Sequence, residues 1–578
     1  MLRTFAEHCL RPVQSLDGLW DFLPECDRAV RGNTPKTFTR KIECPSAWES
    51  IPDLSGYRGA AWYHRTFQVM EGKNVRLAFG GVSHTATVFV DGKEVGGHYD
   101  AFTPWEVLLT GLKPGKHDLT VKVDNTFGDH STLHIPNDYY TYGGITRPVE
   151  LHLVPDLFLD KIFAVPKSGK NGWSLQVRVR VRNVGDTAKG GVIRFSVAGQ
   201  QVEWKLSEIP AGESAEISKS VTGLDVKPWS ETAPNLYDMV AQLSVDDKVI
   251  DDKVDRVGFR EVKVKGKQLL LNGKPLHLRG FNRHEDHPMY GCAIPAIGMA
   301  QDLDLFKDLN CNFLRTCHYP NDMRILDMCD ERGIYVWEES HSRQTPFDPP
   351  NFEAQIRQST LEMVENHFNH ACIVMWGTLN ECDTASDRGM EVHGEVLEYL
   401  RGLDASRPVT YAGHLRQRDR CTRYADIVSW NLYTGWYGGK PEKTLAELEE
   451  MIAWLDSAES GGGKGKPVIV SEFGAGAIYG CRNQRADPWS EEWQCVVLDE
   501  ALKAYLHHPR VVGASIWQFC DVRVTREGNN HTYNAYSPMG RPRCMNNKGV
   551  VDEYRRPKLS YETVKAHMVA AEKKRGRV

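Results

Sequence analysis

The spacing of hydrophobic and polar positions follows two different patterns, one in each part of the chain. Up to about residue 260, short runs of alternating apolar residues such as NVRLAFGG, TATVFVDGKEV and WSLQVRVRVRNV are separated by turn residues. In the second of these runs the alternation leads into Asp91-Gly92, which is typical of a β-hairpin. These runs predict two β-sandwiches in series, one over residues 1–155 and a smaller, immunoglobulin-like one over 156–260.

After residue 261 the apolar runs lengthen and alternate with amphipathic stretches such as FEAQIRQSTLEMVENHFNH, a pattern typical of βα units. Eight such runs occupy residues 277–283, 312–318, 334–340, 372–381, 408–414, 426–433, 467–473 and 511–519. Eight strands with interposed helices predict a (β/α)8 TIM barrel over residues 261–578.

The barrel prediction also indicates where the chemistry should lie, because catalytic groups of such barrels sit at the C-terminal ends of the strands. Glu381 closes the fourth run, and Glu472 closes the seventh, so the two carboxylates can face each other across the barrel mouth. A retaining glycosidase needs two carboxyl groups about 5 Å apart. From spacing alone, a structural carboxylate paired with arginine is an equally good interpretation of each residue.

Composition excludes several other classes of protein. The 578 residues carry a net charge of only -5, and basic residues gather in no stretch except the tail, so we expect no nucleic-acid partner. No apolar run approaches the roughly 20 residues of a membrane helix, so no membrane partner is expected either. The first residues lack the features of a secretory signal, and a cytoplasmic location is the expectation.

Candidate cofactor and metal motifs are weak. The stretch His284-Glu285-Asp286-His287 lacks the spacing that places two imidazoles on one helical face, so no metal site is expected. The segment GGGKGK (461–466) resembles a phosphate loop only superficially and is interpreted as a flexible connection. The 14 cysteines are scattered singly, which is typical of free thiols. We therefore expect no cofactor.

Ordered motifs along nearly the whole chain resemble glycoside hydrolase family 2 and, within it, the β-glucuronidases. These motifs include SLDGLWDF (15–22), DYYTYGGITRPVEL (138–151), NFLRTCHYP (312–320), VMWGTLNEC (374–382), SWNLYTGWY (429–437) and VIVSEFGAG (468–476). The resemblance implies a jelly-roll-like sugar-binding sandwich, an immunoglobulin-like sandwich and a catalytic TIM barrel. It also implies a retaining exo-β-glycosidase that hydrolyses β-D-glucuronides or oligosaccharides by double displacement, and a homo-oligomer, with a tetramer favoured.

The resemblance assigns roles to residues whose motif positions match the family. Glu381 matches the acid/base and Glu472 the nucleophile, while Asn380 is implied to contact the sugar 2-hydroxyl. The remaining candidates for the sugar pocket are Asp138, His318, Asn431, Tyr433, Tyr437 and Trp517. Ordinary packing remains an alternative interpretation of each of these pocket residues.

Substrate choice depends on the segment MNNKG (545–549), which matches the carboxylate-binding motif of the glucuronidases. The resemblance implies that Asn546 and Lys548 bind the substrate carboxylate, while the placement of Arg541 and Arg543 departs from the family pattern and leaves open which arginine supports it. Alternatives are a β-galacturonidase or dual-specificity uronidase, in which Arg343 meets an axial 4-hydroxyl, a β-galactosidase, and a non-catalytic carbohydrate-binding protein.

Overall fold

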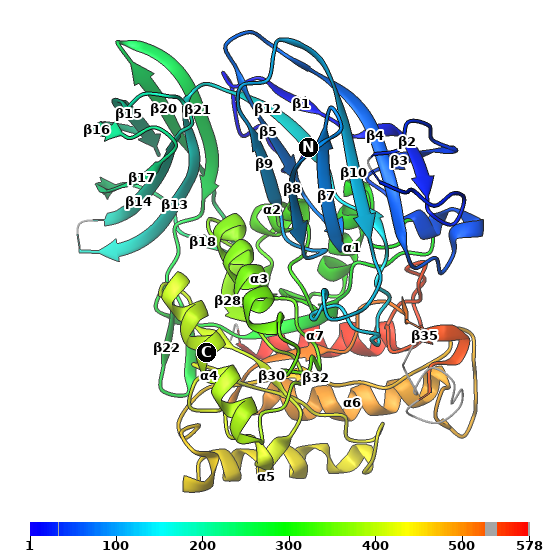
Figure 1. The fold of residues 1–578 in the computed structure, drawn as a ribbon. Helices are drawn as coiled ribbons and strands as arrows, with labels where there is room; N and C mark the ends of the chain where they lie inside the picture. The colour runs from blue at the N-terminus through cyan, green and yellow to red at the C-terminus, as the bar shows by residue number, and fades with distance from the viewer. Residues whose placement is uncertain (33, 171, 526–539, 576–578) are drawn as a thin grey trace.

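The first unit is a β-sandwich in the computed structural model, which describes all residues except 33, 171, 526–539 and 576–578 (Figure 1). Its strands are β1 (Val13–Ser15), β2 (Gly18–Pro24), β3 (Arg40–Cys44), β4 (Ala60–Val69), β5 (Asn74–Phe79), β6 (Val82–Ser83), β7 (Thr85–Val90), β8 (Lys93–Tyr99), β9 (Trp105–Leu109), β10 (Gly115–Asp124), β11 (Gly144–Ile145) and β12 (Val149–Val154), with short helices η1 (Trp48–Ser50) and η2 (Pro52–Leu54). A four-stranded sheet, β1-β12-β5-β9, packs on a six-stranded sheet, β3-β2-β4-β10-β7-β8.

The predicted hairpin at Asp91-Gly92 is confirmed. Strands β7 and β8 pair antiparallel, and burial alternates along β7 as the sequence pattern requires. Asp91 and Gly92 both have positive φ, 50° and 77°, which a two-residue turn of this twist demands of its central residues.

The second unit is a smaller sandwich, at the upper left of Figure 1. Its strands are β13 (Leu157–Gly169), β14 (Gly172–Asn183), β15 (Lys189–Val197), β16 (Gln200–Ile209), β17 (Ser214–Leu224), β18 (Trp229–Ser230), β19 (Ala233–Pro234), β20 (Tyr237–Val245) and β21 (Lys248–Val257). The sheets β13-β14-β17 and β16-β15-β20-β21 enclose an apolar core, as an immunoglobulin-like domain does.

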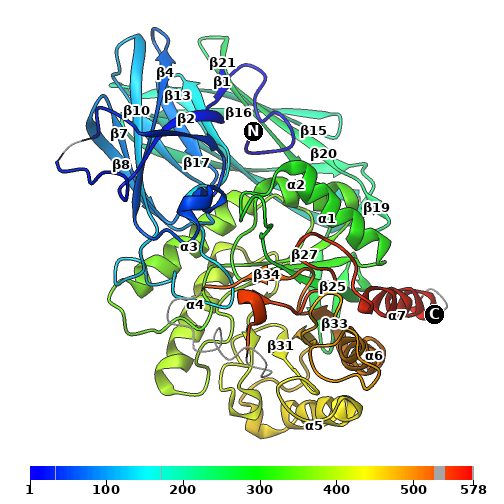
Figure 2. The ribbon, with the colours of Figure 1, turned by 90° about the vertical axis from the view of Figure 1, so that its right-hand side faces the viewer.

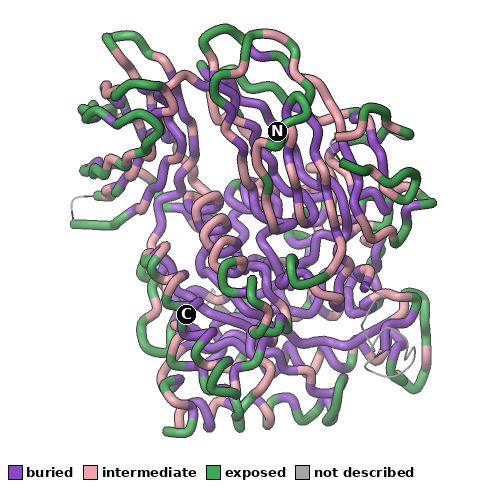
Figure 3. The backbone as a smooth tube through the Cα atoms, viewed as in Figure 1, coloured by how far each residue is buried: buried purple, intermediate pink, exposed green. Residues whose placement is uncertain are grey.

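The third unit is the predicted barrel, entered through the small sheet β22 (Val262–Lys265), β23 (Gln268–Leu271) and β24 (Lys274–Pro275). Its parallel strands are β25 (Leu278–Arg283), β26 (Phe313–Thr316), β27 (Tyr335–Glu339), β28 (Ile373–Gly377), β29 (Val409–Thr410) with β30 (Ala412–Gly413), β31 (Val428–Asn431), β32 (Val468–Glu472) and β33 (Val511–Ile516). All eight predicted strands are present, the fifth being split into two short segments. Every residue of these strands is buried (Figure 3), which explains why they read as continuous apolar runs.

Helices and short connections surround the barrel (Figure 2). They are α1 (Ala296–Asp308), α2 (Met323–Arg332), α3 (Phe352–His367), α4 (Asp387–Leu403), η3 (Arg416–Arg418), η4 (Pro441–Lys443), α5 (Thr444–Leu455), η5 (Ala458–Ser460), α6 (Glu491–His507), β34 (Val522–Arg523), η7 (Pro542–Cys544), β35 (Met545–Asn546) and α7 (Ser560–Arg575). None of the helices in the described ranges is long and apolar enough to cross a membrane.

Two details differ from the sequence expectation. The fourth strand ends at Gly377, so Glu381 lies in the following loop, with a φ of 50°, and does not close the strand. The connection between the fifth and sixth strands contains only the short helix η3 where a full helix was expected. Residues of both connections, Glu381 and Arg416, line a cavity at the barrel mouth.

The first sandwich contributes directly to the barrel mouth. Its segment between β10 and β11 packs through Leu133 against Phe352 and Ile356 of α3. Phe102 of the same sandwich stacks on Tyr319 of the barrel, with ring centroids 3.8 Å apart. These apolar contacts hold the β10–β11 segment, and with it Asp138, at the edge of the barrel.

Candidate active site

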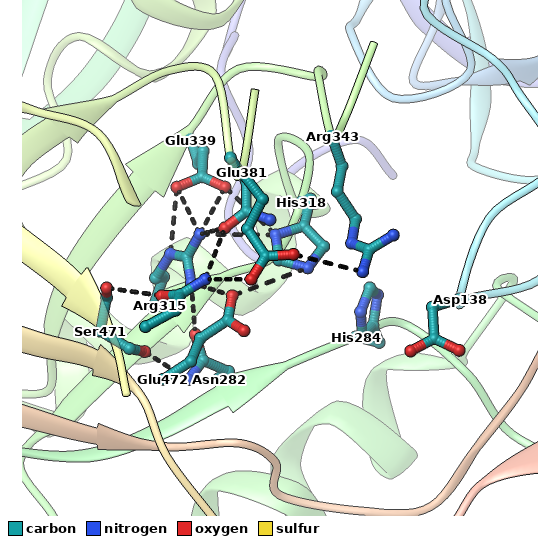
Figure 4. A network of polar contacts seen from close by, with 12 residues as sticks. Asp138, Asn282, His284, Arg315, His318, Glu339, Arg343, Glu381, Ser471 and Glu472 are labelled. Atoms are coloured by element: carbon teal, nitrogen blue, oxygen red, sulfur yellow. Dashed lines mark hydrogen bonds and ion pairs between the residues drawn. The ribbon is translucent and has the colours of Figure 1, made fainter. Parts of the chain in front are cut away.

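Glu472 stands at the end of β32 and is held by two donors (Figure 4). Arg315 Nη1 donates to Glu472 Oε1 at 2.9 Å, and the Tyr433 hydroxyl donates to Oε2 at 2.7 Å. Glu472 is 3% exposed, so its charge depends on these partners for stabilisation. Both donors favour the ionised form of the carboxylate.

Arg315 is the centre of the polar network beneath the cavity. Its guanidinium makes a bidentate contact with Glu339, at 2.8 and 3.0 Å, and also donates to Asn282 and Asn380 at 2.9 and 2.8 Å. Arg315 and Glu339 are fully buried. We call Arg315, Glu339 and Glu472 the catalytic floor. One cation faces two carboxylates there, so the floor keeps an excess negative charge when all three groups are ionised.

Burial and carboxylate neighbours shift the titration of the floor. Burial, together with repulsion from Glu381, raises the pKa of Glu472 to about 7, against the lowering effect of Arg315 and Tyr433. Burial likewise raises the pKa of Glu339 to about 7, although the Arg315 guanidinium opposes the shift. Such perturbed groups in a cavity are typical of a functional site.

Glu381 lies beside Glu472 in Figure 4 and has a different set of contacts. Asn431 Nδ2 donates to Glu381 Oε1 at 3.0 Å, and Gln344 Nε2 donates to Oε2 at 3.1 Å. Arg343 Nη2 lies 3.5 Å from the same Oε2. The Glu381 backbone N–H donates to the Ala412 carbonyl at 2.9 Å, which ties this loop to β30.

A second cluster of charges lies where the first sandwich meets the barrel. Asp138 forms a buried ion pair with Arg541 and accepts a 3.0 Å hydrogen bond from Asn546 Nδ2. Lys548 Nζ lies 3.5 Å from Asn546 Oδ1 and 5.2 Å from the centre of the Tyr437 ring. We call Asp138, Tyr437, Arg541, Asn546 and Lys548 the Asp138 cluster. Two cations face one carboxylate in it.

Electrostatics within the Asp138 cluster follow from this excess of positive charge. Burial, followed by repulsion from Arg541, lowers the pKa of Lys548. The pKa of the Asp138 carboxyl lies below its ordinary range, because the Arg541 guanidinium outweighs the effect of burial. The Tyr437 hydroxyl also has a lowered pKa, because Lys548 and Arg541 together outweigh its burial.

A cavity of about 1040 Å³ joins the catalytic floor to the Asp138 cluster. Most of the candidate residues from the sequence line it: Asp138, Arg343, Glu381, Asn431, Tyr433, Tyr437, Glu472 and Trp517. His318 and Asn380 lie beneath it, fully buried, and His318 stacks on Trp517 at 4.9 Å. His318 Nε2 and Asn380 Nδ2 have no hydrogen-bond partner among the described residues.

Asn546 and Lys548 do not line the cavity directly. They lie behind Asp138, Tyr437 and Arg541, with side chains at most 2% exposed. Arg541 does line the cavity, whereas Arg543 reaches the surface and pairs with Glu553. Of the two arginines that the sequence left open, Arg541 is therefore the one placed to reach a substrate.

Arg315, Glu339 and Asn282 lie in the predicted strand runs 312–318, 334–340 and 277–283, but the sequence analysis assigned them no role. Their importance lies in mutual contacts between β25, β26 and β27, which no single motif displays. Gln344 and Asn137, which contact Glu381 and Arg343, were also missed. Their position directly beside Asp138 and Arg343 in the sequence was the available signal.

Two groups of potential metal ligands occur within the described ranges, Asp100 with His134 and His341, and Asp330 with His370 and Cys372. In the second group, both Asp330 oxygens are occupied by the His370 ring and the Cys372 backbone N–H. In the first group, the Tyr99 hydroxyl accepts two backbone N–H groups and so donates to His134 Nδ1. That bond places a proton on His134 Nε2, which then has no lone pair for a metal. Neither group touches the two candidate carboxylates.

The barrel with a carboxylate pair at its mouth, flanked by two sandwiches, defines a glycoside hydrolase. Models of the glycosyl hydrolases family 2 match all three units: the sugar-binding domain at residues 13–155, the central domain at 157–260 and the TIM barrel domain at 262–569. The chain belongs to glycosyl hydrolases family 2.

Several relatives within the family are named as enzymes that act on uronic acid glycosides, and others are named β-galactosidases. A β-glucuronidase of Streptococcus agalactiae is 28% identical over 577 residues, covering 90% of this chain and 93% of that protein. The structure of a β-galacturonidase from Eisenbergiella tayi bound to galacturonate is 41% identical, with a TM-score of 0.90 and 99% coverage of each chain. A Faecalibacterium prausnitzii β-glucuronidase is 28% identical, with a TM-score of 0.83, covering 98% of this chain and 99% of that one. The resemblance inferred from the motifs is confirmed.

Proposed function

We propose that the protein is a retaining exo-β-glycosidase that releases a β-linked uronic acid, with β-D-glucuronides as its substrates. The main support for this proposal is that one cavity has an excess of negative charge at one end and an excess of positive charge at the other. The catalytic floor has an excess carboxylate beside Glu381, and the Asp138 cluster has an excess cation. A substrate carboxylate taken out of water needs charged partners, and the Asp138 cluster supplies them.

Double displacement follows from the two glutamates. Glu472 attacks the anomeric carbon while Glu381 protonates the leaving oxygen, and Glu381 then deprotonates the water that hydrolyses the glycosyl-enzyme. Arg315 stabilises the ionised form of the buried Glu472, which is the form that attacks. After attack, Glu472 carries no charge, but Arg315 remains paired with Glu339. The network therefore leaves no buried, unpaired arginine during the covalent intermediate.

The cavity residues take binding roles in this proposal. Asn380 Nδ2 contacts the sugar 2-hydroxyl. Arg541 binds the carboxylate from the cavity wall, and Lys548 and Asn546 support its charge from behind that wall. His318, Asn431, Tyr433, Tyr437 and Trp517 surround the ring. The reaction needs no metal or organic cofactor. A homo-oligomer in the cytoplasm completes the proposal, and light scattering on the purified protein measures its assembly state.

A second candidate substrate, the β-D-galacturonide, is favoured by two specific observations. The Eisenbergiella tayi β-galacturonidase is 41% identical over 99% of the chain, whereas the Faecalibacterium prausnitzii β-glucuronidase is 28% identical over 98%. The two sugars differ only at O4, and Arg343 lies on the cavity wall between Glu381 and Asp138 (Figure 4). A guanidinium there can donate to an axial O4.

A panel of 4-nitrophenyl β-D-glucuronide, β-D-galacturonide and β-D-galactoside tests the proposal. We expect at least one uronide to be cleaved far faster than the neutral galactoside, and the ratio of the two uronides decides between the candidates. Proton NMR of the first product should show the β-anomer, since two inversions restore the configuration. Faster cleavage of the galactoside than of both uronides would refute the uronidase proposal.

A further inference from the structure

Asn137 belongs to the first sandwich but contacts a residue of the barrel mouth at two points. Its side-chain Oδ1 accepts a hydrogen bond from Arg343 Nη1, and its Nδ2 donates to the Arg343 backbone carbonyl at 3.3 Å. Asn137 lies in the segment between β10 and β11, is only 3% exposed and lines the cavity. One amide therefore holds both the guanidinium and the main chain of Arg343.

The main chain around Arg343 is also fixed relative to Glu381. The Gln344 N–H donates to the Asn380 carbonyl at 2.9 Å, and the Asn380 N–H donates to the Ser342 carbonyl at 2.9 Å. These bonds join the backbone on both sides of Arg343 to the residue directly before Glu381. The distance between the guanidinium and the Glu381 carboxylate is therefore set by the Arg343 side chain.

That distance is longer than in a fully formed ion pair. Arg343 Nη2 lies 3.5 Å from Glu381 Oε2 (Figure 4), whereas a charge-assisted hydrogen bond between such groups is about 2.7 to 2.9 Å long. Gln344 Oε1 also accepts from Arg343 Nη1, at 3.1 Å, but Gln344 is exposed. Asn137 is thus a buried anchor that holds the guanidinium short of the carboxylate.

Without this anchor, the guanidinium should move toward Glu381. Arg343 is attracted by both Glu381 and Asp138. Asp138 is already paired with Arg541, and its cluster has an excess of positive charge that repels another cation. The other side-chain donors to Glu381 within the described part of the chain are neutral amides. Glu381 is therefore the stronger attractor.

The proposed mechanism gives this gap a consequence. Glu381 must carry a proton that it gives to the leaving oxygen, and a guanidinium in closer contact favours the ionised carboxylate instead. Glu472 acts in the opposite direction, because two neighbouring carboxylates disfavour double ionisation. Burial and Glu472 hold the pKa of Tyr433 above its ordinary value, so this neighbour stays neutral. Arg343 is the cation whose position Asn137 controls.

We propose that Asn137 is a positioning residue for the acid/base: it keeps the Arg343 guanidinium from closing on Glu381, so that Glu381 can hold the proton needed by the leaving group. The inference rests on the proposed function. Through this contact, a residue of the first sandwich acts on proton transfer at the mouth of the barrel.

The test uses the phenyl and 2,4-dinitrophenyl glycosides of the uronic acid that the wild type prefers, so that both substrates make the same contacts through the sugar. In Asn137→Ala, the basic limb of the kcat/KM profile on the phenyl glycoside should move to lower pH by about one unit, the scale of a nearby opposite charge. Above the limb, its cleavage should fall about tenfold. The 2,4-dinitrophenyl glycoside needs little protonation and should change by less than about twofold.

Three further variants separate positioning from a general loss of structure. Asn137→Asp keeps an oxygen that accepts from the guanidinium, so its basic limb should lie at or above that of the wild type. Asn74→Ala removes a buried asparagine of the same sandwich, which bonds to Asp156 and does not line the cavity, and should change neither the limb nor either activity. In the Arg343→Met background there is no guanidinium to move, so Asn137→Ala should shift the limb no further.

Thermal midpoints verify that each variant folds as the wild type does. A basic limb that stays in place or rises in Asn137→Ala, or an equal loss on both glycosides, would overturn the positioning role and leave the uronidase function intact. A shift that persists in the Arg343→Met background, or a lowered limb in Asn137→Asp, would overturn it as well. A wild type that cleaves no uronide would instead refute the proposed function.

Discussion

The catalytic floor and the Asp138 cluster are built from the same parts but carry opposite charge. Each contains a buried arginine paired with a carboxylate and backed by asparagine, Arg315 with Glu472 and Arg541 with Asp138. In the floor a second carboxylate, Glu339, joins the pair, whereas in the cluster a second cation, Lys548, does so. The charge of the third side chain thus sets the function of each buried pair. With Glu339 the site has a spare carboxylate for nucleophilic attack, and with Lys548 it has a spare cation that can bind an anion.

The largest effect should come from removing the charge excess of the floor. Glu472→Ala should abolish turnover, by about six orders of magnitude in kcat on every substrate, because removing a nucleophile has that scale of effect.

Glu381→Ala should lower activity on a poor leaving group by about two to four orders of magnitude and spare an activated aryl glycoside far more. Steady-state kinetics on aryl glycosides of graded leaving-group pKa measure this contrast. Equal losses across the series would show that the roles are misassigned.

Next in size is the loss of the charge excess of the Asp138 cluster. Lys548→Ala leaves the substrate carboxylate without one of its buried partners, which costs about 3 to 5 kcal/mol. We expect kcat/KM on uronides to fall by roughly two to four orders of magnitude, while slow hydrolysis of a neutral galactoside changes little. Lys565→Ala, on the exposed face of α7, is the control. An equal loss on neutral and anionic substrates would contradict the assignment.

Arg541 and Arg543 offer a matched pair two residues apart. Arg541 is buried on the cavity wall, and Arg543 is paired with Glu553 at the surface. Arg541→Gln should lower kcat/KM on uronides by about 10- to 100-fold, the scale of one charge-assisted hydrogen bond, and Arg543→Gln should have no measurable effect. If Arg543→Gln had the larger effect, the cluster would be assigned to the wrong arginine.

The smallest expected effect concerns pH. Because the pKa of Glu472 is raised to about 7, the ionised nucleophile is present above that value and is lost as the pH falls through it. The acidic limb of the kcat/KM profile should therefore lie above the ordinary glutamate value, as an apparent pKa of the carboxylate pair. Tyr433→Phe removes a hydrogen bond to the anion and should move this limb upward by about one to two pH units.

Tyr437→Phe is the matched control for this shift, because Tyr437 belongs to the Asp138 cluster and not to the floor. It should leave the acidic limb in place. A limb that stays fixed in Tyr433→Phe, or one that moves equally in both variants, would mean that the Tyr433 hydroxyl does not stabilise the nucleophile.

The architecture could be predicted because the burial of strands and helices determines the spacing of apolar residues along the sequence. Alternating positions marked sandwich strands such as β7, and continuous apolar runs marked the eight barrel strands. Glu381 was correctly placed at the barrel mouth, but it was assigned to the end of the fourth strand instead of the loop that follows. The end of that strand depends on its pairing with neighbours such as β29, which the sequence does not display. The role of Arg315 could not be inferred, since its partners come from four other strands or strand ends and converge only in the folded barrel. Motif resemblance located Lys548 but not its position behind Tyr437.

Covalent trapping is the most direct test of the account. A 2-deoxy-2-fluoro β-uronyl fluoride carries a leaving group that needs little protonation, while its fluorine slows hydrolysis of the intermediate. Incubation with the wild type, proteolysis and peptide mass spectrometry locate the attached sugar. The account predicts one sugar on the peptide that contains Glu472 and none in Glu472→Ala. A label on Glu381, or rapid turnover to the α-anomer without any label, would contradict it.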